Sequence, residues 1–226
     1  MLFFRRKKYA ENLRRELSGL DFPHPVGVFI PAGAGNLKLY RHARPGFLTL
    51  DAPSDAIIPW IDSFQELHAH TPIAVNIRHQ IVRTFSLVYD FADLLIIEPD
   101  ENDGHFSEDA PDTTALLDEL LSLRLCYERY TPIYLRLYKG LTPSEITPLL
   151  SFCQLSGIDG IVAPGTKKLE LVKQATLGRL PVIGQASSTE EALSLLEAGA
   201  TLVETHLRPL QLPKLMKTVE KQAKKP

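Results

Sequence analysis

The sequence has little cysteine and no strong excess of either charge. Its two cysteines, Cys126 and Cys153, lie in apolar helical patterns. Such patterns are typical of small buried side chains rather than of a disulfide framework or a metal site. The formal net charge of −2 argues against a nucleic-acid partner, because a phosphate backbone requires a basic surface. The two cysteines fit a reducing cytoplasm. The partner expected is a small-molecule ligand, and a homodimer is left open.

Long hydrophobic runs are also missing. No run approaches the roughly 20 apolar residues that span a bilayer, so we expect no transmembrane segment, and no signal-peptide core follows the N-terminus. Residues 1–8 read Met-Leu-Phe-Phe-Arg-Arg-Lys-Lys. This segment predicts a solvated first helix, with weak peripheral membrane contact as the alternative.

What the sequence does contain is a regular succession of short apolar runs with helical patterns between them. Strict alternation of strand and helix predicts an α/β fold with a parallel sheet and helices outside. Eight such units favour a closed (β/α)8 TIM barrel, with an open doubly wound sheet as the alternative. The expected strands are Val26–Ile30, Phe47–Leu50, Ile73–Asn76, Leu94–Ile97, Ile133–Leu137, Gly160–Ala163, Val182–Gly184 and Leu202–Glu204.

Helix boundaries carry recognisable signals. Thr142 and Ser188 each precede a glutamate by three residues, which is the capping-box pattern. We expect residues 1–20 to form an N-terminal helix across the closed end of the barrel and residues 21–226 to form the barrel as a single domain. The expected helices include Ala56–Leu67, Thr114–Tyr130, Ser144–Leu155, Leu169–Leu177, Glu190–Glu197 and Lys214–Lys225, and Gly157, Gly178 and Gly199 are expected as left-handed caps.

Several passages resemble dihydroorotate dehydrogenases, the flavin enzymes that oxidise dihydroorotate to orotate in pyrimidine biosynthesis. His-Pro-Val-Gly-Val at 24–28 resembles the family's first strand, and Ala-Asp-Leu-Leu-Ile-Ile at 92–97 resembles its fourth. Residues 157–163, 180–184 and 198–203 resemble strands six to eight. The resemblance implies a TIM-barrel flavoprotein, an oxidoreductase that binds FMN.

Chemistry in such barrels lies at the C-terminal ends of the strands. By resemblance, Asn76 and Thr166 are the candidate substrate-binding residues. Glu101 stands where the family has its Ser or Cys base, and Arg136 stands where a Lys neutralises reduced flavin, so both are candidate catalytic residues. From its chemistry, Arg136 either binds an anion in the mouth or pairs with Glu98 or Asp100.

The resemblance also assigns candidate FMN contacts, although the residue types differ from the family pattern. The glycine pairs that normally bind the flavin phosphate are absent after strands seven and eight. Glu98 and Glu204 add negative charge, which opposes a phosphate. FMN is therefore implied by the resemblance and opposed by the residues. The candidate contacts are Ala32, Gly33, Glu98, Arg136, Gly184, Ser187, Ser188 and Arg208.

Three functional hypotheses follow. The residues favour a relative that kept the barrel and has degenerate FMN and catalytic sites, a pseudoenzyme, over a divergent but active dehydrogenase. The third is a non-redox barrel enzyme or ligand-binding protein, in which Glu98, Asp100 and Glu101 hold a metal or a phosphorylated small molecule. The acidic stretch 98–112 is interpreted as a solvated loop, with a divalent cation as its alternative ligand, and no metal ligands are assigned.

Overall fold

A computed structural model describes residues 15–17, 19–32, 38–52, 71–99 and 111–222. Eight parallel strands close into a barrel in the order β10-β3-β4-β5-β6-β7-β8-β9. All eight strands expected from the sequence are confirmed, and their ends differ from the expected bounds by at most two residues. The strands are β3 (Val26–Ile30), β4 (Leu48–Asp51), β5 (Ile73–Ile77), β6 (Leu94–Ile97), β7 (Ile133–Arg136), β8 (Gly160–Pro164), β9 (Val182–Ala186) and β10 (Leu202–Thr205).

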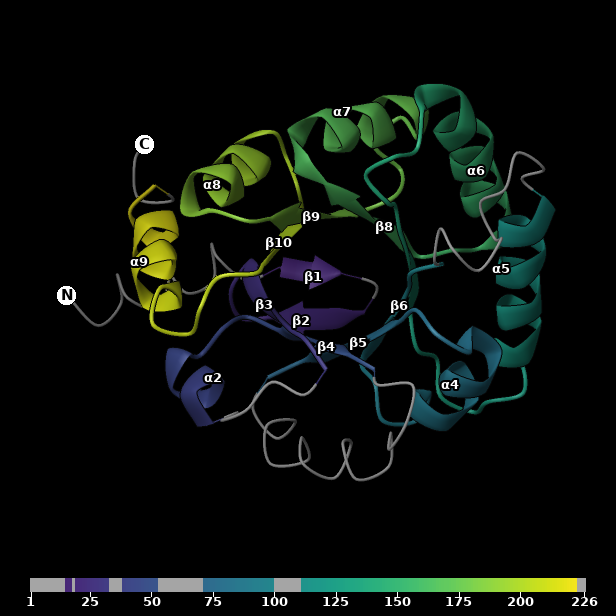
Figure 1. Ribbon diagram of the computed structural model, residues 1–226, viewed down its shortest axis with the longest axis horizontal. Helices are drawn as coiled ribbons and strands as arrows, with labels where there is room; N and C mark the ends of the chain where they lie inside the picture. The colour runs from purple at the N-terminus through teal and green to yellow at the C-terminus, as the bar shows by residue number, and fades with distance from the viewer. Residues whose placement is uncertain (1–14, 18, 33–37, 53–70, 100–110, 223–226) are drawn as a thin grey trace.

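Helices surround the barrel (Figure 1). The predicted cap at Thr142 and the left-handed glycines at 157, 178 and 199 are confirmed. The predicted helix Ala56–Leu67 lies outside the described residues. The described helices are α2 (Lys38–Ala43), α4 (Ile81–Val88), α5 (Pro111–Arg124), α6 (Pro143–Ser156), α7 (Gly165–Ala175), α8 (Thr189–Glu197) and α9 (Leu212–Gln222). No helix among them is long and apolar enough to cross a membrane.

Helix α5 ends earlier than its hydrophobic pattern suggested. The sequence predicted a helix to Tyr130, but α5 ends at Arg124. Of the apolar residues beyond it, Tyr127 packs on the core from a loop, with its ring centroid 3.9 Å from that of Tyr89, whereas Leu125 and Tyr130 are exposed. Cys126 follows the helix end and is therefore exposed, so the expectation that it is buried was wrong. Cys153 is buried as expected, and burial raises the pKa of its thiol to about 12.

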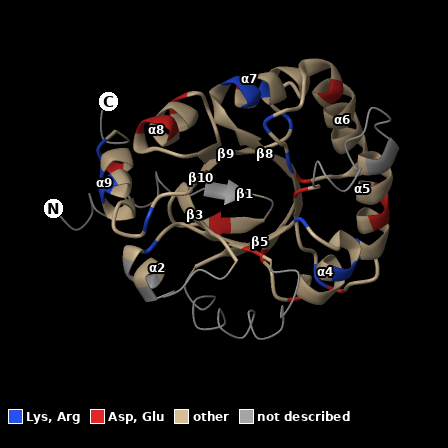
Figure 2. Ribbon diagram, in the orientation of Figure 1, with Lys and Arg blue, Asp and Glu red and all other residues tan. Residues whose placement is uncertain are grey.

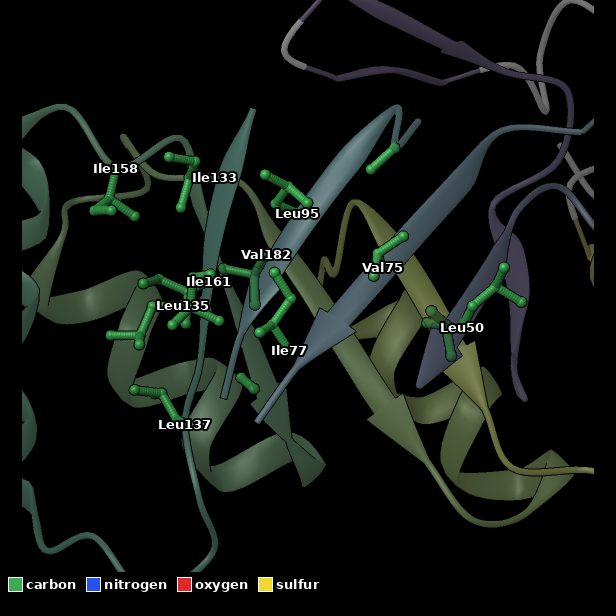
Figure 3. Close-up of a cluster of buried hydrophobic side chains, with 14 of the residues drawn as sticks. Leu50, Val75, Ile77, Leu95, Ile133, Leu135, Leu137, Ile158, Ile161 and Val182 are labelled. Atoms are coloured by element: carbon green, nitrogen blue, oxygen red, sulfur yellow. The ribbon is translucent and has the colours of Figure 1, made fainter. Parts of the chain in front are cut away.

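The larger hydrophobic core lies between the strands and the surrounding helices. Successive strand residues point to opposite faces, and every barrel strand contributes buried apolar residues on its outward face. Thr205 of β10 is a buried polar residue on this face, and its hydroxyl donates to the Gly27 carbonyl at 3.1 Å. Figure 3 shows part of this layer, in which Leu50, Val75, Leu95 and Leu135 project from four neighbouring strands. Burial of this continuous apolar layer is the main force that holds the helices on the barrel.

A second core fills the barrel interior. Ala74, Ile96, Tyr134 and Leu202 belong to this inner cluster, together with Phe47 near the N-terminal end of the strands. Large rings fit because glycines face them: a Cβ added at residue 27 would lie 2.4 Å from the Phe47 ring, and one at residue 160 would lie 2.2 Å from the Tyr134 ring. The interior is therefore a packed core and not a channel.

An antiparallel ribbon covers the N-terminal end of the barrel. It consists of β1 (Arg15–Leu17) and β2 (Leu20–Phe22), which lie across the centre of the ring in Figure 1. Leu17 and Phe22 join the inner core, and the Phe22 ring meets Phe47 edge-on at 5.7 Å. The N-terminal helix expected over residues 1–20 falls mostly outside the described residues. Where the structure describes this segment, residues 15–17 form a strand, because the apolar side of a short ribbon closes the barrel.

Candidate functional site

A layer of polar residues lies at the C-terminal end of the barrel, directly above the inner core. Asn76, Glu98, Arg136 and Glu204 each follow an apolar residue of the inner core by two positions. Because side chains alternate along a strand, these four share its inward face. Asp51 ends β4 and joins them through hydrogen bonds. The mouth of the barrel is therefore lined by ionisable and amide groups that the closed sheet brings together.

Arg136 and Glu204 form a buried, two-bonded ion pair at the centre of the mouth. Arg136 Nη1 lies 2.8 Å from Glu204 Oε1, and Nη2 lies 3.1 Å from Oε2. Burial alone would lower the pKa of Arg136 and raise that of Glu204. Each charge outweighs this effect on its partner, so the pKa of Arg136 is raised and that of Glu204 is lowered. Both groups therefore stay ionised and bound to each other.

Asn76 connects this pair to the remaining carboxylates. Its Oδ1 accepts a hydrogen bond from Arg136 Nε at 3.0 Å. Its Nδ2 donates to Asp51 Oδ1 at 3.0 Å and to Glu98 Oε2 at 2.6 Å. A primary amide has two donor hydrogens and one acceptor oxygen, so this fully buried side chain has both hydrogens and its oxygen engaged. These contacts hold the two carboxylates in place beside Arg136.

A second arginine covers the outer side of the network. Arg78 follows β5 and its Nη2 lies 3.0 Å from Asp51 Oδ1 and 3.8 Å from Glu98 Oε2. About a third of its side chain is exposed, so solvent screens these contacts more than those of Arg136. Arg136 also approaches Glu98, at 3.5 Å. The network thus contains three carboxylates and two guanidinium groups, a formal balance of −1.

His206 lies at the edge of the mouth, two residues beyond Glu204. Its ring packs on Phe29 with the centroids 4.7 Å apart, and its Nε2 lies 2.8 Å from Gln185 Nε2. In this arrangement the Gln185 amide donates to an unprotonated ring nitrogen. Burial lowers the pKa of His206, and although Glu204 acts in the opposite direction, the pKa is lowered overall. The imidazole is therefore neutral near pH 7, and its ring lines the edge of the mouth beside the charged network.

The structure brings three of the predicted site residues into contact and leaves others apart. Asn76, Glu98 and Arg136 form one hydrogen-bonded group. Thr166 lies in the first turn of α7, and Ala32 lies on an exposed turn after β3. The expected alternatives for Arg136 included an ion pair with Glu98, which is present, but the principal partner is Glu204. Gly33, Asp100 and Glu101 lie outside the described residues.

Sequence reasoning missed two members of the network. Asp51 and Arg78 are both engaged in it, yet neither was selected as a candidate. The signal was available for Asp51, because it is a polar residue at the C-terminal end of an apolar strand, as Asn76 is. Arg78 lies just beyond its strand, and nothing in the local pattern indicates where its side chain points. Among the described residues, no group of three or more His, Cys, Asp or Glu side chains is arranged to hold a metal ion.

The turn after β9 is built differently from a phosphate cradle. Gly184 packs against α8, where an added Cβ would lie 3.0 Å from the Leu195 side chain. The Ser188 hydroxyl caps α8 by accepting from the Glu191 amide at 3.1 Å. The Ser187 amide and hydroxyl both donate to the Glu191 carboxylate. After β10, the Arg208 amide donates to the Gln211 side chain at 3.2 Å.

Comparisons with known proteins point to one group of enzymes. No protein-family model matches the chain. Two curated relatives, both named dihydroorotate dehydrogenase (quinone), come from strains of Cereibacter sphaeroides and are 24% identical over 147 residues. The match covers 52% of this chain and 42% of each relative, so the chain spans about two fifths of the curated relatives that it matches.

Solved structures with a similar fold are also dihydroorotate dehydrogenases (DHODH). The chain superimposes on a DHODH from Eimeria tenella in complex with ferulenol with a TM-score of 0.70 and 15% identity, covering 94% of this chain and 85% of that one. The ligand-free enzyme from the same organism gives a TM-score of 0.70, with 16% identity over 93% of this chain and 86% of that one. The chain is thus a (β/α)8 barrel. It is dihydroorotate-dehydrogenase-like in fold along most of its length, with weak sequence similarity over about half of it.

The residues described at the mouth do not fit FMN as the resemblance would place it. The cation at the flavin position, Arg136, is neutralised by Glu204 and also contacts Glu98. At the phosphate position, the Ser187 amide and hydroxyl are bonded to Glu191, a carboxylate that would repel a phosphate. Both ends of the cofactor would therefore meet a protein carboxylate in place of a free donor.

Proposed function

We propose that this chain is a dihydroorotate-dehydrogenase-like barrel that does not carry out flavin redox chemistry and instead binds a small neutral or cationic molecule at its mouth. The observation that carries the proposal is the bidentate Arg136–Glu204 pair. A buried guanidinium whose charge is cancelled by a buried carboxylate has little attraction left for an anionic flavin or for the carboxylate of dihydroorotate.

The charge balance of the mouth supports this class of ligand. Within the hydrogen-bonded network, three carboxylates and two guanidinium groups leave −1, with His206 counted as neutral and with Lys139, whose charge acts on His206, outside the network. A negative site favours neutral or cationic molecules over phosphate esters. The alternative from the sequence, a metal or phosphorylated ligand held by Glu98, Asp100 and Glu101, has Glu98 in the described network. Its other two residues lie outside the described ranges.

Flavin content tests the first half of the proposal. We expect the purified protein to be colourless, to gain no bound flavin absorbance after incubation with FMN and gel filtration, and to show no dihydroorotate turnover with quinone or dye acceptors. Stoichiometric FMN in the purified protein, or turnover above a heat-denatured control, would contradict it and would favour an active dehydrogenase.

A ligand screen tests the second half. In thermal-shift assays we expect neutral or cationic small molecules, but not phosphate esters, to raise the melting temperature. Asp51→Asn should reduce that shift, whereas Glu170→Gln on the exposed surface of α7 should leave it unchanged. A shift produced by divalent cations or phosphate esters and lost in Glu98→Gln would instead favour the non-redox alternative.

We also propose a reducing, cytoplasmic location and a single domain over residues 21–226. Both cysteines of the chain are free thiols, Cys126 exposed and Cys153 buried, which suits a reducing compartment. Native alkylation of Cys126 without prior reduction is the expected result. A homodimer and membrane contact by residues 1–8 stay predictions, which size-exclusion chromatography and sedimentation with anionic vesicles can test.

A further inference from the structure

The turn between β9 and α8 occupies a special place in the barrel. β9 is the seventh barrel strand counted from β3. The turns after strands seven and eight are where (β/α)8 barrels often bind phosphate, because exposed amides meet the N-terminus of a helix there. In this chain two donors of the turn, the amide and the hydroxyl of Ser187, already have an anionic partner from within the protein.

That partner is the carboxylate of Glu191. Its Oε2 accepts from the Ser187 amide at 2.8 Å and from the Ser187 hydroxyl at 2.7 Å. Its Oε1 lies 3.6 Å from the position that a Cβ would take at residue 165, where the backbone has a φ of +69°. The carboxylate therefore lies between the turn after β8 and the turn after β9.

The electrostatic surroundings suit an anion at this point. The carboxylate lies beside the first turn of α8, where unpaired amides and the helix dipole give a partial positive charge. Burial alone would raise the pKa of Glu191, but the hydrogen bonds from Ser187 and the charge of Lys139 lower it overall. Glu190 and Glu191 lie in the first turn of α8, and Lys167 and Lys168 lie near the start of the neighbouring helix α7. Figure 2 shows acidic residues on α8 and basic residues on α7.

We propose that the Glu191 carboxylate occupies the position of an anion in the turn between β9 and α8. It thereby excludes inorganic phosphate and phosphate esters from this turn. A phosphate needs the same Ser187 donors that the carboxylate uses, and it would be repelled by the carboxylate at that distance. The same Ser187–Glu191 contacts also oppose an FMN phosphate, but phosphate binding at the β9–α8 turn can be measured whatever molecule binds at the mouth.

The test measures binding of inorganic phosphate to the intact chain and to variants at constant ionic strength by calorimetry. Glu191→Ala should bind phosphate saturably, with an affinity about tenfold or more above the wild type, the ratio expected from one charge-assisted hydrogen bond. Glu190→Ala is the matched control, because this neighbouring glutamate also lies in the first turn of α8 and is exposed. It should leave the affinity at the wild-type level.

Two further variants keep the inference falsifiable. Glu191→Gln retains the side-chain size and removes the charge, so it should raise phosphate affinity even if Glu191→Ala does not fold. Adding Lys139→Ala to either variant should weaken the gain. Unchanged phosphate affinity in the folded Glu191 variants, or equally tight binding by the wild type, overturns the inference. FMN bound by the wild-type protein would count against both proposals, whereas the phosphate titration of the Glu191 variants tests the role of this carboxylate alone.

Discussion

The two ends of the barrel interior solve the same packing problem with opposite chemistry. At the N-terminal end, Leu17, Phe22 and Phe47 close the barrel with apolar contacts. At the C-terminal end, Arg136 and Glu204 occupy the same interior with charges that are as deeply buried as those rings. Both ends are filled. At the N-terminal end any apolar side chain of suitable volume could take part in the packing, whereas at the C-terminal end each charged group requires its particular partner.

This difference has an energetic meaning. Apolar burial is non-directional and depends on volume and area, so the closed end should respond to changes in size and hardly to pH. A buried ion pair depends on both partners, since removing one leaves an uncompensated charge. The mouth should therefore respond to single substitutions and to pH. Three predictions test this difference, in order of decreasing expected size.

The closed end should show the largest loss. Phe47→Ala removes a fully buried ring that packs on Phe22 and Gly27, and we expect it to lower the free energy of unfolding by about 4 kcal/mol through lost burial and a cavity. Urea denaturation measures the loss, which should be the same at pH 7 and pH 5. Leu155→Ala, at a leucine that is 89% exposed, is the control and should change stability by less than about 0.5 kcal/mol. Equal losses in the two variants would contradict the assignment of Phe47 to the core.

The mouth should show a comparable loss with a different pH dependence. Arg136→Met leaves Glu204 buried and unpaired and should cost about 3 kcal/mol at pH 7. In the wild type the pKa of Glu204 is lowered, so its contribution is present above the ordinary value of 4.5 and is lost as the pH falls through the lower folded value. In Arg136→Met the unpaired carboxyl has a raised pKa, so its cost should shrink as the pH falls towards 4.5.

Urea denaturation between pH 7 and pH 4 separates these opposite trends. Combining Arg136→Met with Glu204→Leu should recover much of the loss, because an apolar pair of similar volume needs no counter-charge. If the double variant is no more stable than Arg136→Met, Glu204 is not the group that makes the single substitution costly.

The smallest effect concerns His206. Its pKa is lowered in the folded protein, so between pH 7 and the folded value the unfolded chain binds a proton that the folded chain does not. Acidification through this window should therefore destabilise the protein slightly, and His206→Asn should reduce the slope. NMR titration of the imidazole should give a pKa below 6.5. A value at or above 6.5 would show that burial against Phe29 does not dominate the environment of the ring.

The barrel strands and several helix ends could be predicted because their signals are local. Continuous apolar runs marked the strands, and Thr142 with Glu145 marked a capping box that the structure confirms. Errors arose where an apolar pattern continued past the end of an element. Beyond α5, Tyr127 packs on the core from a loop, and the same hydrophobic spacing made this loop look helical.

The candidate site was predictable only in part. Asn76, Glu98 and Arg136 could be selected because they stand at the C-terminal ends of barrel strands, where the family resemblance places its binding residues. Their partners could not be assigned in the same way. Glu204 is 68 residues from Arg136, and Asp51 is 25 residues from Asn76. Glu191 was interpreted as part of a helix cap, but that its carboxylate would reach Ser187 depends on how the turn is folded.

The alternation of strands and helices, the helix caps and the polar strand ends follow from local sequence, because they depend on neighbouring residues and on the period of each element. The pairing of the charged side chains follows from the folded barrel. Closure of the barrel places β7 and β10 across a shared interior, and there the cost of leaving a buried charge unpaired selects Glu204 for Arg136.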